Sequence, residues 1–138
     1  MSFINSIFDD CEKVGLSAPA VNRRIKKMFD SGLLRREVVV SKPSDLGLPI
    51  TAITQVQVVK THIETLAEIE ARLSASPFVQ QCYYVSGSWD FVLIILAKDP
   101  EHYSELAREL FHDNPYIKRF ETSIKIKTVK QSFITPLT

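Results

Sequence analysis

The sequence predicts an α+β protein in which an N-terminal helix-turn-helix remnant precedes a ferredoxin-like βαββαβ domain. Up to Leu34 the apolar residues recur with the spacing of a helix, and beyond it they follow the pattern of strands around two helical interruptions. The second part divides into two βαβ units in series, which is the plan of an antiparallel four-stranded sheet with both helices on one face. The 138 residues suffice for one medium domain or two small ones.

A short helix is predicted between Ser17 and Gly32. Ser17 is a residue type that caps the first turn, Pro19 suits a helix start because its missing N–H costs little there, and Gly32 supplies the left-handed residue that ends a helix. The turn at Gly15 and the apolar residues before it predict a preceding helix, so the two together form a helix-turn-helix. One face of the predicted helix is apolar and consists of Val21, Ile25 and Met28.

The opposite face of this helix is basic. Residues 17–36 hold six basic residues and one acidic residue, whereas residues 37–138 hold ten basic and twelve acidic residues. A solvated helix face gives a similar pattern, but the place of the helix and the segregation of charge favour nucleic-acid binding. We expect this face to contact double-stranded DNA. Base edges, or the phosphates beside them, are expected to be contacted by residues near the start of the helix, namely Ser17, Pro19, Asn22 and Arg23. Phosphates are expected to be contacted by the remaining basic residues, namely Arg24, Lys26, Lys27, Arg35 and Arg36.

The rest of the chain reads as a strand, a linker and a sheet domain. Leu34 to Ser41 has the pattern of a strand, and the residues from Ser41 to Asp45 have the composition of a turn. We therefore predict a partial, winged helix-turn-helix domain over residues 1–36, a strand and linker over 37–49, and a ferredoxin-like domain over 50–138. Within the last, strands are predicted over 50–60, 78–85, 91–97 and 117–129, with helices over 63–73 and around Tyr103 to Phe111.

The predicted strand from Phe91 to Ala97 is apolar at every position. Such a strand is expected to be buried on both faces, yet two helices on one side of the sheet cover only one of them. No further segment of the chain is available for the second face. We therefore predict that a second copy of the chain packs there, in a closed symmetric oligomer.

Other classes of function find little support in the sequence. It has no apolar run long enough to cross a membrane and no secretory signal at its start, so a cytoplasmic protein is expected. Cys11 and Cys82 are too few and too far apart for a metal site, and the three histidines lack ligand spacing. No nucleophile triad, carboxylate pair or phosphate-binding glycine loop stands out. We expect no metal, no cofactor and no enzymatic activity.

Four segments resemble the Lrp/AsnC family of transcription regulators. The residues from Val14 to Ser17, with Val21, Arg23 to Ile25 and Gly32, are similar to the recognition-helix signature of that family. The segment Leu46 to Leu48 resembles the entry to its ligand-sensing module. Val85 to Phe91 is similar to the family's Gly-Asp-aromatic-Asp loop, and Arg119 with Thr122 and Ser123 resembles the start of its last strand.

The resemblance implies a sequence-specific DNA-binding regulator whose C-terminal domains pair into dimers, tetramers or octamers and bind an amino acid or a related metabolite. Carried over by position, the effector-binding residues are Gly87, Ser88, Trp89, Asp90, Thr122 and Ser123. Gly87 allows close approach of a ligand carboxylate, and Asp90 offers a partner for an ammonium group. A plain hairpin turn is the alternative interpretation of the loop.

The resemblance also has two departures. The family carries a further helix ahead of the recognition helix, so the helix-turn-helix of this chain is predicted to be incomplete and marginal on its own. Ser88 stands where the family commonly has an acid. A sensor-only oligomer therefore stays an alternative, as does an enzyme like the tetrapyrrole decarboxylases related to the family, which would have to gather His62, His102, His112, Arg72, Arg108 and Arg119.

Overall fold

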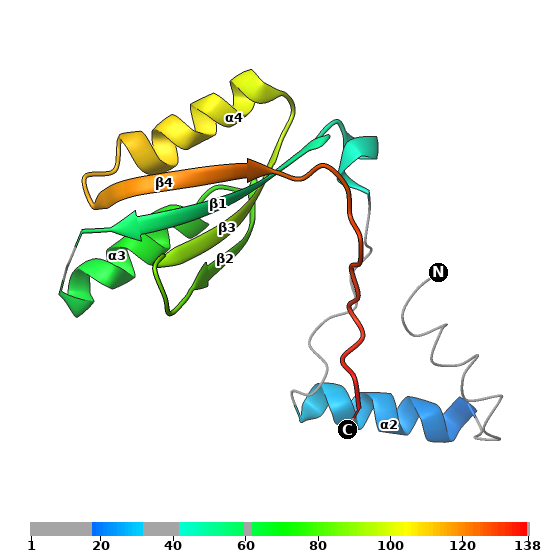
Figure 1. Cartoon of the computed structure of the whole chain (residues 1–138). Helices are drawn as coiled ribbons and strands as arrows, with labels where there is room; N and C mark the ends of the chain where they lie inside the picture. Colours follow the sequence, from blue (N-terminus) through cyan, green and yellow to red (C-terminus); the bar gives the residue numbers. More distant parts are fainter. Residues whose placement is uncertain (1–17, 32–41, 60–61, 138) are drawn as a thin grey trace. The chain divides into compact units, whose positions relative to one another are not determined.

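The computed structural model of the chain describes residues 18–31, 42–59 and 62–137 (Figure 1). The chain divides into two compact units, Met1–Ser41 and Lys42–Thr138. The first contributes one described helix, and the second contains a complete sheet with its helices. The predicted domain boundaries themselves stay predictions.

The described helix of the first unit is α2, Ala18–Asp30. Val21 and Ile25 are buried and Met28 is half-buried, so the predicted apolar face is the inner one. After its last residue, the amide of Ser31 donates to the carbonyl oxygen of Lys27 at 2.9 Å, and the Ser31 hydroxyl donates to that of Met28 at 3.1 Å. The predicted cap Ser17, the stop Gly32, the strand from Leu34 and the preceding helix lie outside the described residues.

The second unit is an antiparallel four-stranded sheet with strand order β2-β3-β1-β4. A 3₁₀ turn, η1 (Pro43–Leu46), ends at Gly47 in the left-handed region and leads into the sheet. The elements that follow are β1 (Ile50–Val58), α3 (Ile63–Ser74), β2 (Val79–Tyr84), β3 (Phe91–Ala97), α4 (Pro100–Ala107), the π-helical turn η2 (Arg108–His112) and β4 (Ile117–Ile124). The predicted βαββαβ order is confirmed.

The core lies between the sheet and its two helices. Ile69 and Leu73 of α3, and Leu106 of α4 with Leu110 and Phe111 of η2, form one cluster with alternate residues of the two central strands. Those strand residues are Ala52, Val56, Phe91, Leu93, Ile95 and Ala97, all nearly or fully buried. The same face of the sheet therefore carries both helices, as the strand alternation predicts.

The last strand is shorter than predicted. The pattern favours a strand up to Val129, but β4 ends at Ile124, and the amide of Lys125 makes a final bond to the Thr51 carbonyl at 2.9 Å. The reason is the partner: Ile124 pairs with Ala52, close to the start of β1, so the ladder has no further strand to follow. Residues 125–137 have no regular secondary structure.

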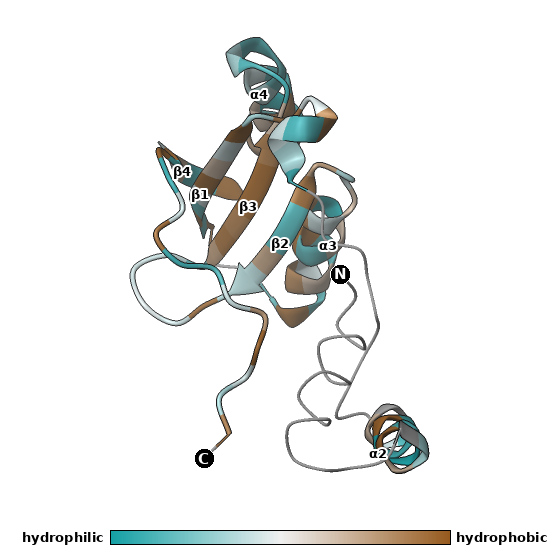
Figure 2. Ribbon diagram, turned by 90° about the vertical axis from the view of Figure 1, so that its right-hand side faces the viewer, coloured by the Kyte–Doolittle hydropathy of each residue, from teal (hydrophilic) through white to brown (hydrophobic). Residues whose placement is uncertain are grey.

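The sheet face opposite the helices is apolar along its centre (Figure 2). Ile53 pairs with Ile94, and Val92 lies between Tyr83 and Gln55 in neighbouring strands. In the single chain Val92 and Ile94 are half-buried and Tyr83 is 51% exposed. β3 is thus fully covered on one face only, which leaves its other face for the partner that the sequence predicts.

Candidate functional site

The loop between β2 and β3 is fastened at its base by Asp90. Its amide donates to the Val56 carbonyl at 2.9 Å, its carbonyl accepts from the Val85 amide at 2.9 Å, and its Oδ2 accepts from the Val58 amide at 2.8 Å. Asp90 therefore continues the contact between β1 and β3 beyond the last paired residues. The loop residues that the sequence singles out, Gly87 to Asp90, project from a rigid base.

The tip of the loop depends on Gly87. Its φ of 129° lies in a region that residues with a Cβ rarely adopt, although a Cβ built there would meet no atom within 4 Å. Backbone conformation, and not space, is what requires glycine. The next residue is held loosely from β1, since Gln57 Nε2 donates to the Ser88 carbonyl at 3.4 Å.

Trp89 carries a cation on its ring. The guanidinium carbon of Arg119 lies 4.6 Å from the ring centroid, in the range of a cation–π interaction. Arg119 comes from β4, where it pairs with Gln57 on the sheet face opposite the helices. Arg119 belongs to the residues that carry the family resemblance but not to the effector-binding residues predicted from the sequence. The βαββαβ order, which brings the start of the last strand beside this loop, is the signal that could have found it.

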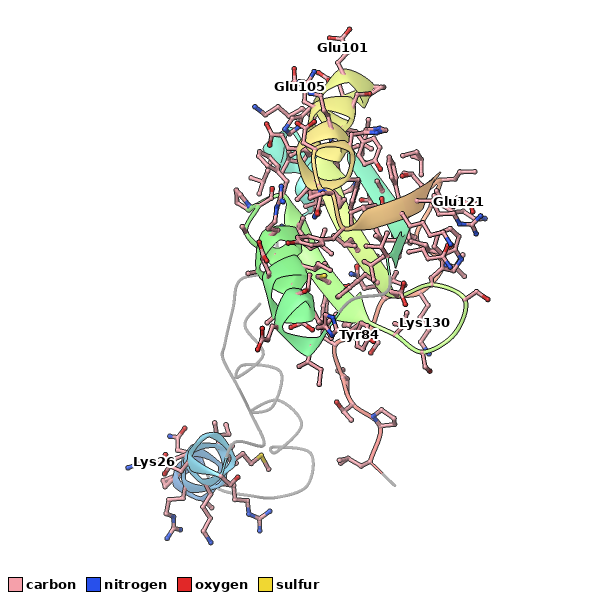
Figure 3. All side chains as sticks on the ribbon, turned by 90° about the vertical axis from the view of Figure 1, so that its left-hand side faces the viewer. Lys26, Tyr84, Glu101, Glu105, Glu121 and Lys130 are labelled. Atoms are coloured by element: carbon pink, nitrogen blue, oxygen red, sulfur yellow. The ribbon has the colours of Figure 1, made fainter. Side chains whose placement is uncertain are left out.

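A hollow of about 730 Å³ lies beside the loop and is lined in part by Asp90. Its wall is apolar at Val58, Val59, Ile63 and Leu66, and its polar lining is Gln57, His62, Tyr84, Asp90 and Lys118. Tyr84 is 60% exposed and packs on Phe91 with 5.1 Å between ring centroids, and Figure 3 shows it at this end of the sheet. Apart from Asp90, and His62 of the enzyme alternative, these residues were not expected from the sequence, because they come from four different element ends.

The structure does not bring Thr122 and Ser123 to the loop. Thr122 lies on the helix side of β4, where its hydroxyl shares hydrogen bonds with Thr54, at 3.3 Å, and with Tyr103. Ser123 lies on the opposite face, beside Ile53. Both are three or more residues beyond Arg119, roughly 10 Å along the strand.

The basic face of α2 is exposed. Asn22, Arg23, Arg24, Lys26 and Lys27 are exposed, as is Pro19 at the helix start, and the four basic residues share this surface with one acid, Asp30. Figure 3 shows the side chains of this helix, with Lys26 labelled, directed away from its axis. A row of cations on an exposed helix suits phosphate contact. The other predicted DNA contacts, Ser17, Arg35 and Arg36, lie outside the described residues.

The histidines and arginines of the enzyme alternative are dispersed. His62 lines the hollow, the ring of His102 packs on Phe78 with 4.5 Å between centroids, and the ring of His112 lies 5.1 Å from that of Phe120. His102 Nδ1 accepts from the Lys98 amide at 3.0 Å, so this ring is held by its own corner of the fold.

The described residues form no metal site and no activated thiol. No cluster of three or more His, Cys, Asp or Glu side chains there could hold a metal ion. Burial, with a smaller effect of Glu70, raises the pKa of the Cys82 thiol, which keeps it protonated and weakly nucleophilic. No described helix is long and apolar enough to cross a membrane.

The sheet domain matches a known family. Residues 51–134 match the family described as the Lrp/AsnC ligand binding domain. An uncharacterized HTH-type transcriptional regulator of Sinorhizobium fredii is 34% identical over 126 residues, which cover 91% of this chain and 75% of that protein. The transcriptional regulator AzlB of Bacillus subtilis is 30% identical, over 91% of this chain and 80% of its own.

Solved structures agree with this match. An AsnC family transcriptional regulator from Agrobacterium tumefaciens superimposes with a TM-score of 0.85 at 25% identity, covering 94% of this chain and 84% of that one. A transcriptional regulator from Neisseria meningitidis, solved as a complex with L-methionine, shares the fold at a TM-score of 0.83 and 23% identity, over 91% and 81% of the two chains. The chain belongs to the Lrp/AsnC family of transcriptional regulators.

Proposed function

We propose that this regulator binds double-stranded DNA through α2 and responds to an amino acid bound at the loop between β2 and β3. The proposal assigns no reaction to the chain, and it places the protein with the DNA in the cytoplasm. Its relatives bear the names of transcriptional regulators, and the Neisseria meningitidis structure holds an amino acid.

One observation carries the sensing half of this proposal. Asp90 lines the hollow together with Lys118, and its neighbour Trp89 carries the guanidinium group of Arg119 over its ring. An amino acid needs a cation for its carboxylate and an acid for its ammonium group. Gly87, Ser88, Trp89 and Asp90 remain the proposed effector residues, with Arg119 and Lys118 added; Thr122 and Ser123 stay predicted contacts that this geometry does not favour.

Charge carries the DNA-binding half. The exposed residues Arg23, Arg24, Lys26 and Lys27 occupy consecutive turns of α2, opposite the buried Val21 and Ile25. A helix presented in this way enters the major groove or lies along the phosphates. We further propose that the apolar sheet face around Ile94 holds a second copy of the chain, so that two basic helices act on one DNA site.

The test is DNA binding of the full chain in a salt series. Fluorescence anisotropy with duplex DNA from the region upstream of its own gene measures affinity at each salt concentration, with a scrambled duplex as reference. The double variant Lys26→Gln with Lys27→Gln loses two phosphate contacts, so we expect the slope of log affinity against log salt to fall by about 0.9 for each contact. The twenty amino acids are then added one at a time at millimolar concentration. We expect the effector, and no other amino acid, to change the affinity of the intact chain for DNA.

The matched control changes the same charge elsewhere. Lys98→Gln with Lys127→Gln removes two exposed cations from the sheet unit and is expected to leave the slope unchanged. An unchanged slope in the α2 variant contradicts the proposed role of that helix. Unchanged affinity with every amino acid contradicts the proposed sensing.

A further inference from the structure

Building on the proposed function, we propose that the loop selects an anionic ligand, an amino acid with a second carboxylate in its side chain, and that Arg119 is the residue that recognises this carboxylate. Three features of the loop and of the strand beside it support this class of effector. They are the two cations against one acid, the position of Arg119 over the ring of Trp89, and the hydrogen bond that already occupies one oxygen of Asp90.

The loop between β2 and β3 and the first residues of β4 together carry two cations and one acid. Lys118 and Arg119 are consecutive in β4 and both are exposed, and Lys118 lines the hollow while Arg119 lies over Trp89. The acid is Asp90, which lines the hollow with Lys118, and Ser88 adds no charge. Glu121 is the next acid on the face of Arg119, opposite Gln55 (Figure 3). Within the described part of the chain, no ion pair joins Arg119 or Lys118 to a carboxylate.

Arg119 is posed for a carboxylate. The guanidinium carbon lies over the Trp89 ring, 4.6 Å from its centroid, and within the described part of the chain no hydrogen bond or ion pair occupies the guanidinium N–H groups. The edge of a guanidinium matches the two oxygens of a carboxylate in a bidentate pair. The contact with Trp89 also restricts the long side chain before the ligand arrives, so less conformational freedom is lost on binding.

One of the two carboxylate oxygens of Asp90 is already bonded. Its Oδ2 accepts the Val58 amide at 2.8 Å, and its Oδ1 is left for one ammonium group. One acid with one oxygen in use, together with two cations from the start of β4, complements a ligand with one ammonium and two carboxylates better than a ligand with one of each. L-Glutamate and L-aspartate have this composition, and L-glutamine and L-asparagine have nearly the same shape without the second charge.

The experiment compares these pairs on the full chain. Trp89 is the sole tryptophan of the sequence, so its emission reports directly on the loop. We expect L-glutamate or L-aspartate to shift the emission and to bind at least about tenfold more tightly than the corresponding amide, the order expected for one charge-assisted hydrogen-bonded contact. Isothermal titration calorimetry of the same pairs detects binding that leaves the emission unchanged.

Two variants assign the preference to Arg119. Arg119→Gln is expected to reduce the ratio of acid to amide affinity to near one, whereas Arg119→Lys, which keeps the charge and loses the planar edge, is expected to retain part of it. Lys127→Gln makes the same change of net charge in the segment after β4 and is expected to leave the ratio unaltered. Circular dichroism of each variant checks that it folds.

The outcomes separate this inference from the proposed function. Tighter binding of the acid that is lost in Arg119→Gln supports the inference. Equal or tighter binding of the amide, or of a neutral or basic amino acid, overturns it while amino-acid sensing at the loop stands. A preference for the acid that survives Arg119→Gln overturns the role of Arg119. Absence of binding by any of the twenty amino acids, in emission and in heat, contradicts the inference and the proposed sensing together.

Discussion

Asp90 holds the loop to the centre of the sheet as well as facing the ligand site. Three of its polar groups are bonded to Val56, Val58 and Val85, two of them in the central strand β1. A carboxylate that accepts a backbone N–H contributes more to stability than a neutral acceptor does. The same residue therefore fixes the geometry in which Trp89 and Arg119 meet.

Replacing Asp90 is expected to destabilise the sheet unit. Asp90→Ala leaves the half-buried Val58 amide without its acceptor, at a cost of roughly 1–3 kcal/mol, and Asp90→Asn, which keeps an oxygen there, is expected to cost less. Urea unfolding at fixed protein concentration, followed by Trp89 emission, measures both. Ser88→Ala in the same loop is the control, and it is expected to stay within about 0.5 kcal/mol of the unchanged chain. An Asp90→Ala variant as stable as Ser88→Ala contradicts the anchoring role.

The loop residues could be predicted from the sequence, and the partner of Trp89 only in part. Gly87 to Asp90 are marked by a glycine between two strands and by family resemblance, and both signals are local. The order of elements places the start of β4 at the same end of the sheet as this loop, but the contact of Trp89 with Arg119 reaches from the loop before β3 across β1 to β4. Such a contact depends on register and loop length, which hydrophobic alternation does not specify.

At the scale of elements, β4 separates two adjacent residues that the family resemblance groups together. Successive side chains of a strand point to opposite faces. Thr122 accordingly lies against α4 and Ser123 lies on the open face, although the sequence treats them as a pair. The family resemblance transfers positions along the chain, and the two-residue period of the strand divides them between two surfaces.

The helix predicted up to Phe111 also differs in a way with a physical cause. The α-helix α4 ends at Ala107 and continues as the π-helical turn η2, in which the amide of Asp113 donates to the Arg108 carbonyl at 2.8 Å. The wider turn lets the consecutive residues Leu110 and Phe111 both enter the core. The apolar spacing predicted the buried residues, but the change of helix type follows from packing.

A hydroxyl cluster fixes α4 to the sheet. Thr54 is fully buried in β1, and its hydroxyl lies 3.1 Å from the Tyr103 hydroxyl of α4 and 3.3 Å from that of Thr122 in β4. Tyr103→Phe is expected to lower the free energy of unfolding by roughly 0.5–1.5 kcal/mol, since Thr54 keeps Thr122 as a partner. The same urea titration measures it, with Tyr84→Phe as the control because the Tyr84 side chain is 60% exposed. Equal stability of the two variants contradicts a structural role for the cluster.

At the scale of the whole molecule, the notable surface is the face of the sheet opposite α3 and α4. Ile53, Val92 and Ile94 form its centre, and both described helices of the sheet unit, α3 and α4, lie on the other face. Apolar surface exposed in a continuous patch favours association. The fold class, the order of elements along the chain and the apolar character of β3 could all be predicted from the sequence, because each follows from the spacing of apolar residues. The extent of that patch could not, since it depends on which side chains neighbouring strands place beside β3.

A charged residue in this apolar face is expected to dissociate the oligomer into single chains. Ile94→Lys puts a charge at the centre of the patch, where burying it against a second sheet is strongly unfavourable. Light scattering after size exclusion is expected to give a dimer or larger for the unchanged chain and a monomer for the variant, with circular dichroism confirming the fold. Ala71→Lys, on the exposed side of α3, adds the same charge and is expected to keep the oligomer. An Ile94→Lys variant of unchanged mass places the interface elsewhere.

The central strand β1 links the two ends of the sheet unit mechanically. It begins at Ile50, just after the segment that connects the two units, and ends at Val58, whose amide is bonded to Asp90 in the loop. Hydrogen bonds to β3 and β4 along both edges stiffen it over about 30 Å. One continuous stretch of backbone, hydrogen-bonded along both edges, therefore joins the loop at one end of the sheet to Leu48 and Pro49 at the other end.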